Sequence, residues 1–106
     1  MSFTRKEEIE ALLATDDSRT GKVWRWQQEG LTMHDMQERL GNSTPPTNET
    51  INIAALRDGT NPKSRTTAAL AANKVRSWLK SKELSSGLRD EMEAQLSELE
   101  LIAAPK

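Results

Sequence analysis

The chain has 106 residues, no cysteine, a single histidine and a formal net charge of −1, from 15 Lys and Arg against 16 Asp and Glu. This length, without a twenty-residue apolar run, predicts one domain or a small domain with a helical appendage, and no membrane span. The absence of cysteine excludes disulfide and thiol chemistry, and the first ten residues hold no apolar signal region, so a cytoplasmic protein is expected. Near-neutral net charge argues against a nucleic-acid binder held by bulk positive charge.

The charges are unevenly distributed. Residues 1–60 carry seven bases and ten acids, residues 61–82 carry six bases and no acid, and residues 83–106 carry six acids against two bases. An anionic partner is therefore expected to meet the 61–82 segment.

Two short helices are predicted first. Thr4 and Glu7 form a capping box before Ile9, Leu12 and Leu13, which recur on one side of a helix. A second helix is predicted over residues 18–29 and ends at Gly30. Its two indoles, at positions 24 and 26, point about 160° apart at 100° per residue, so they cannot share one stripe. Trp24 either packs against another element or anchors a partner from an exposed position.

Residues 23–59 read as three helical patterns separated by turn residues. The middle pattern, residues 32–40, starts at Thr32 and Asp35 and stops at Gly41. A connector rich in Pro, Asn and Ser follows at 41–46, and Thr47 is predicted to cap a third helix over 47–58. This helix is apolar nearly all round, which is typical of a buried helix.

The motif GLTMHDMQERLG at residues 30–41 resembles the Gly-x-Thr…Leu-Gly pattern of the helix-turn-helix superfamily of DNA-binding domains. The resemblance covers about a third of the chain. It implies that the 47–58 helix enters a major groove with Thr47, Asn48 and Asn52 near base edges, while the 32–40 helix crosses the backbone. Asn48 and Asn52 either read adenine edges or only cap and turn the chain. The connector is longer than is usual in that superfamily, and the 47–58 helix carries one base, Arg57.

A long helix is predicted over residues 62–81, with Asn61 as its cap and Pro62 in the first position. Its inner face holds Ala68, Ala71, Ala72, Val75, Trp78 and Leu79. A second face holds Arg65, Ala69, Asn73, Arg76 and Lys80. Lys63 lies two residues before Arg65. These bases either contact phosphates, meet an acidic partner protein, or form a solvated face.

A final helix is predicted over residues 88–103 after a break at Ser85-Ser86-Gly87. Its apolar positions form a narrow stripe surrounded by acids, at Leu88, Met92, Leu96, Leu99 and Ala103. The helix either folds back over the preceding unit or pairs with its copy in a homodimer. We therefore expect an all-α fold of five or six helices, with residues 1–83 forming a helix-turn-helix-like domain and residues 84–106 a C-terminal helix.

Catalysis has little support, because the chain lacks Cys, Tyr and a Gly-rich phosphate loop. His34 and Glu38 lie one turn apart, but no third ligand is evident, so no metal or cofactor is expected. Two functions remain: a small protein that binds double-stranded DNA, as a transcriptional regulator or accessory factor, or an adaptor or inhibitor that binds a protein. The DNA-binding set comprises Thr47, Asn48, Asn52, Arg57, Lys63, Arg65, Asn73, Arg76 and Lys80.

Overall fold

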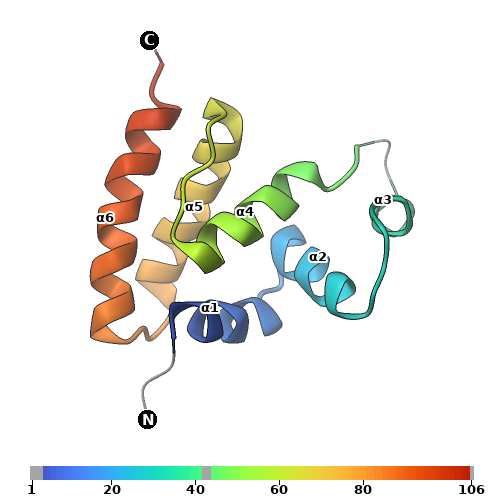
Figure 1. Ribbon diagram of the computed structural model, residues 1–106, viewed down its shortest axis with the longest axis horizontal. Helices are drawn as coiled ribbons and strands as arrows, with labels where there is room; N and C mark the ends of the chain where they lie inside the picture. Colours follow the sequence, from blue (N-terminus) through green and yellow to red (C-terminus); the bar gives the residue numbers. More distant parts are fainter. Residues whose placement is uncertain (1–3, 42–43, 106) are drawn as a thin grey trace.

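The computed structural model describes residues 4–41 and 44–105, and every regular element within them is an α-helix (Figure 1). The six helices confirm the all-α prediction. They are α1 (Arg5–Ala14), α2 (Arg19–Gln28), α3 (Met33–Leu40), α4 (Thr47–Asp58), α5 (Arg65–Ser81) and α6 (Ser86–Ala103). The middle of the predicted connector, residues 42–43, lies outside the described residues. None of the described helices is both long and apolar enough to cross a membrane.

Local capping chemistry fixes where several helices begin and end. Thr4 with Glu7 forms a capping box at the start of α1, and Thr32 with Asp35 forms one at the start of α3. Each box satisfies backbone N–H groups that have no partner inside the helix. Gly41 follows α3 with a φ of 69°, the left-handed conformation in which glycine carries no Cβ penalty. The predicted stop signals are therefore confirmed at this end.

Three predicted helix starts were wrong. Helix α5 begins at Arg65, because the Ser64 hydroxyl accepts the Thr67 backbone N–H. Asn61, the predicted cap, instead donates a hydrogen bond to Glu98 of α6, so the chain before Ser64 belongs to a loop. Likewise α6 begins at Ser86, two residues early, because Ser85 caps it. At α4 the N-cap position is held by Pro46, and Thr47, the predicted cap, is the first helical residue.

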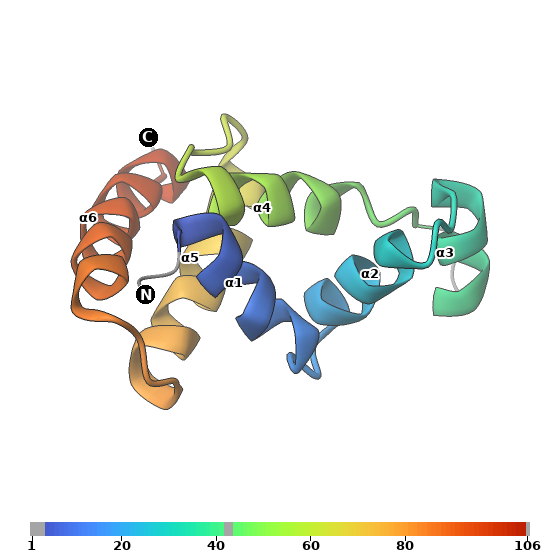
Figure 2. The same cartoon turned by 60° about the horizontal axis from the view of Figure 1, so that its bottom comes forward.

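Helices α5 and α6 lie side by side as a hairpin at one end of the molecule, and α4 runs away from them toward α3 at the other end (Figures 1 and 2). Helix α4 is central, since α1, α2 and α5 all pack against it. As expected of a helix that is apolar nearly all round, α4 buries Asn52, Ile53, Ala55 and Leu56, although Ile51 stays 42% exposed.

One hydrophobic core joins residues from all six helices. Its buried members include Ile9 and Leu13 of α1, Val23 of α2, Met36 of α3, Ile53 and Leu56 of α4, Ala68, Ala71, Ala72, Val75 and Trp78 of α5, and Leu88, Met92 and Leu99 of α6. The alanines of α5 place its backbone close to its neighbours, and Trp78 fills the remaining space. The C-terminal helix thus folds back onto the preceding helices, and its buried residues complete their core.

Candidate nucleic-acid interface

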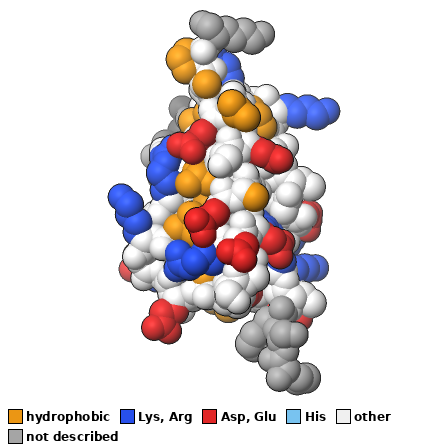
Figure 3. Space-filling model, turned by 90° about the vertical axis from the view of Figure 1, so that its left-hand side faces the viewer, with side chains coloured by type: hydrophobic (Ala, Val, Ile, Leu, Met, Phe, Trp, Pro, Cys, Tyr) orange, Lys and Arg blue, Asp and Glu red, His pale blue; other side chains and the backbone are white. Residues whose placement is uncertain are grey.

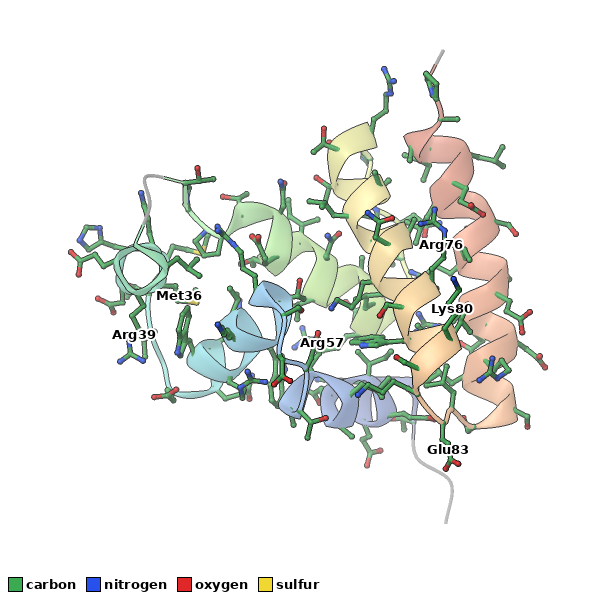
Figure 4. The ribbon with its side chains drawn as sticks, turned by 180° about the vertical axis from the view of Figure 1, so that it is seen from behind. Met36, Arg39, Arg57, Arg76, Lys80 and Glu83 are labelled. Carbon is green, nitrogen blue, oxygen red and sulfur yellow. The ribbon has the colours of Figure 1, made fainter. Side chains whose placement is uncertain are left out.

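A row of exposed polar side chains follows one side of α5. Arg65, Asn73, Arg76 and Lys80 are exposed, as predicted for this face of the helix, whereas Ala69 between them is part-buried. Lys63 is exposed in the loop before the helix. Figure 4 shows Arg76 and Lys80 on the same side of α5. We call Lys63, Arg65, Arg76 and Lys80 the basic row.

Among the described residues, one member of the basic row, Arg76, pairs with a neighbouring acid. The Arg76 Nη2 atom lies 3.4 Å from Oε2 of Glu100 on α6, and Nη1 donates to Oδ1 of Asn73 at 2.6 Å. Both partners of the ion pair stay near half-exposed, at 43% and 52% of their side chains, so solvent screens the attraction. Within residues 4–41 and 44–105, no ion pair involves Lys63, Arg65 or Lys80.

Acidic side chains gather beside the basic row. Figure 3 shows several of them together on the outer side of α6, which packs along α5. The exposed acids of this helix are Asp90, Glu91, Glu93, Glu98 and Glu100. The positive surface of α5 therefore borders a negative one, and the field that a distant polyanion meets is weaker than the basic row alone would produce.

Lys74 belongs to the same acid-free segment, but it points away from the basic row. Its Nζ atom lies 2.9 Å from Oδ2 of Asp16, donates to the Ser18 hydroxyl at 2.7 Å, and sits 5.8 Å from the centre of the Trp78 ring. Sequence reasoning missed this contact, because Asp16 and Ser18 read only as a stop and restart between helices. The sequence does contain one indication of the turn, because Asp16 and Ser18 lie two residues apart and such a pair favours a local hydrogen-bonded turn.

Asp16 is 8% exposed, and its environment changes its acidity. Burial would raise the pKa of Asp16, but hydrogen bonds from the Ser18 backbone N–H, from Lys74 and from the Ser18 hydroxyl, together with the Lys74 charge, lower the pKa below its ordinary value of 3.8. The carboxylate is thus ionised at neutral pH and fastens the α1–α2 turn to α5.

The residues expected to reach base edges from α4 lie in different environments. Thr47 is exposed, but Asn48 is part-buried, and its Oδ1 accepts a hydrogen bond from the Thr67 hydroxyl at 3.1 Å. Asn52 is 5% exposed and faces inward. Arg57 is part-buried, with Nη1 3.9 Å from Oε2 of Glu10 on α1. The exposed side of α4 consists of Thr47, Ile51 and Asp58.

The two indoles of α2 are both part-buried and pack against the core. Trp24 is therefore in the packed environment that was one of its two predicted alternatives, although its buried Nε1 has no hydrogen-bond partner among the described residues. Trp26 packs with α3, where the Arg39 guanidinium carbon lies 5.7 Å from the indole ring centre. This cation–π contact helps to hold α3 on the end of the molecule.

His34 and Glu38 form an exposed pair, with Nε2 3.1 Å from Oε1 and side chains 78% and 69% exposed. No cluster of three or more His, Cys, Asp or Glu side chains suited to a metal ion occurs in the described part of the chain. No protein-family model, curated protein or solved structure matches this chain.

Proposed function

We propose that the protein is a small DNA-binding factor that contacts the phosphate backbone of duplex DNA through the basic row of α5. The observation that carries the proposal is the exposure of Lys63, Arg65, Arg76 and Lys80 along an element without acids, three of them free of ion pairs within the described chain. From Arg65 to Lys80 the row extends about 22 Å at 1.5 Å per residue. Because a DNA strand carries one phosphate per 3.4 Å of axis, this length faces several phosphates.

The surroundings of the row limit how such a contact works. Glu100 competes with phosphate for Arg76, and neighbouring acids of α6 repel the backbone. The inward positions of Asn48 and Asn52 leave Thr47 as the exposed polar side chain at the start of α4. The proposed binding is therefore mainly backbone contact, with weak preference for sequence and strong dependence on salt.

Fluorescence-anisotropy titration with duplex DNA at several salt concentrations tests the proposal. The variant Arg65→Ala/Arg76→Ala/Lys80→Ala should bind more weakly, and the slope of log affinity against log salt should fall by about 3, because each lost phosphate contact releases about one counterion fewer. A control is Lys6→Ala/Lys22→Ala, which removes two exposed charges from α1 and α2, outside the basic row.

The control variant should keep most of the salt slope of the parent. Equal slopes for the α5 variant and the parent would remove the basic row from the interface. Absence of binding to any duplex at low salt would reject the DNA proposal itself.

A second candidate is a protein contact through the outer side of α6. Leu101 there is 78% exposed, the largest exposure among the large hydrophobic residues of the described chain. A second copy or another protein could cover it. Sedimentation equilibrium of the parent and of Leu101→Glu distinguishes self-association from the monomer: a concentration-dependent dimer that the substitution disperses supports a homodimer through α6.

A further inference from the structure

A recess of about 340 Å³ opens between the N-terminus of α2, the first half of α4 and the middle of α5. Its walls include Arg19 and Thr20 of α2, Glu49 and Asn52 of α4, and Leu70 and Lys74 of α5. Asn73 of the predicted DNA-binding set also lines the recess, but no member of the basic row does. Hydrogen-bond donors line one side of the recess, at the start of α2, and hydrogen-bond acceptors line the opposite side, on α4.

The donor side is the start of α2. The first backbone N–H groups of a helix have no partner inside the helix. The residue that could cap them, Ser18, makes no cap hydrogen bond, because its hydroxyl donates to Asp16 Oδ2 at 2.9 Å instead. Lys74 adds an ammonium whose bonds to Asp16 and Ser18 use two of its three N–H groups. An anionic group at this end of the recess would therefore meet donors that are not yet used.

The acceptor side is formed by α4. Asn52 is 5% exposed, and its Oδ1 has no hydrogen-bond partner among the described residues. A buried acceptor without a partner lowers the stability of the fold, so such an atom is usually met by a water or a ligand. Glu49 stands one turn before it, with Oε1 2.7 Å from the Arg19 Nε atom. This side suits a group that donates several hydrogen bonds.

The charges around the recess are already balanced. Arg19 pairs with Glu49, and Lys74 pairs with Asp16. A ligand with a net charge would leave one charge unbalanced in a part-buried site. A ligand of zero net charge that carries one positive and one negative group matches both sides. The recess also offers Leu70, 44% exposed, to an apolar substituent.

We infer that the recess binds a free α-amino acid as its zwitterion. The ammonium donates to Asn52 Oδ1 and Glu49, and the carboxylate accepts from the first N–H groups of α2 and from Lys74. An aliphatic side chain lies against Leu70. This inference is independent of the DNA proposal, since no member of the basic row takes part.

Isothermal titration calorimetry with L-leucine tests the inference, using isovalerate and 3-methylbutylamine as probes that each carry only one of the two charged groups. L-leucine should bind, and neither single-charge probe should bind at the same concentration. Asn52→Leu, close in volume but without the acceptor, should weaken L-leucine binding about tenfold, since a hydrogen bond to a charged group is lost. Glu49→Gln should weaken it as well.

The matched control is Glu100→Gln, which breaks the ion pair with Arg76 outside the recess and should leave L-leucine binding unchanged. Circular dichroism confirms that each variant is folded. The inference is overturned if L-leucine gives no binding heat, if isovalerate alone binds as tightly, or if Asn52→Leu binds like the parent. Should Asn52→Leu fail to fold, unchanged affinity in Glu49→Gln overturns the inference instead.

Discussion

Gly21 shows how one missing side chain permits the close approach of two segments. A Cβ atom at this position of α2 would lie 2.1 Å from the backbone oxygen of Asp16. Backbone cannot move aside as the end of a flexible side chain can. The turn between α1 and α2 therefore requires glycine here, although its φ is not in the left-handed region.

Gly21→Ala should destabilise the protein by about 3 kcal/mol, because the methyl group overpacks a site enclosed by main chain. Gly87→Ala is the matched control, as Gly87 lies in the first turn of α6 and an added Cβ there would meet no atom within 4 Å. Replacing a helical glycine by alanine should stabilise by about 0.5 to 1 kcal/mol. Urea denaturation of both variants measures the difference, and equal effects of the two substitutions would contradict the close approach.

The Asp16–Lys74 pair should make stability depend on pH. Because the pKa of Asp16 is lowered in the fold, its stabilisation is complete above the unfolded pKa and is lost as pH falls through the lower folded pKa. Asp16→Asn leaves Lys74 without its ionic partner, so at neutral pH this variant should be less stable by about 3 kcal/mol.

The difference in unfolding free energy between the parent and Asp16→Asn should shrink as the pH is lowered through 3.8 and below, since the parent then protonates the same carboxyl. Urea denaturation across this pH range measures it. Asp17→Asn, at the exposed neighbouring position, should behave as the parent throughout. A pH-independent gap between the parent and Asp16→Asn would show that the carboxylate charge does not contribute.

At the scale of the element, α6 shows which side of an amphipathic helix carries the stability. Leu99 is fully buried, whereas Leu101, two residues on, is 78% exposed. Leu99→Ala should cost about 3 kcal/mol through lost burial and the cavity left behind. Leu101→Ala should change stability by less than about 0.5 kcal/mol. Thermal and urea unfolding measure the stability of both variants. A similar loss of unfolding free energy in both would contradict the packing of α6 through Leu99.

Helix α4, which was expected to enter a DNA groove, exposes few of its side chains. It lies between α1, α2 and α5, so its buried residues face several directions. Only a narrow side, at Thr47, Ile51 and Asp58, reaches solvent. A helix in this position contributes mainly to the core, which is why the proposed DNA contact lies on α5.

At the scale of the whole molecule, the core is continuous from α1 to α6. The predicted division at residues 83 and 84 separates α6 from the inner face of α5, where Val75 and Trp78 are buried in the same cluster as Leu88 and Met92. A chain ending at residue 83 would expose that face to water, and a chain of that length has little core to lose.

Residues 1–83 alone should therefore lose cooperative unfolding and bind a dye specific for exposed apolar surface. Circular dichroism during urea titration and dye fluorescence measure these two properties against the full chain. A sigmoidal transition with parent-like helix content in the fragment would show that residues 1–83 fold by themselves and that α6 is not needed for the core.

The sequence by itself determined the helices and their inner faces. Capping residues such as Thr4 and Thr32 act within one turn, and the spacing of Ala68, Ala71, Val75 and Trp78 is a property of one helix, so both can be read locally. The exposed basic row on α5 was predictable for the same reason. Helix starts were less predictable where two caps competed, as at Asn61 and Ser64, because a contact with α6 decided between them.

Only the tertiary structure decided which polar side chains stay exposed and can contact a partner. Lys74 and Arg65 belong to the same basic segment. Lys74 forms an ion pair with Asp16, 58 positions away in the chain, and is part-buried, whereas Arg65 stays exposed. The sequence left open whether Asn52 reads bases or only caps and turns the chain, and the packing of α4 between its neighbours buries the side chain of Asn52. The physical reason is that burial and ion pairing depend on neighbours distant in the chain, and no periodicity within one helix records which neighbours those are.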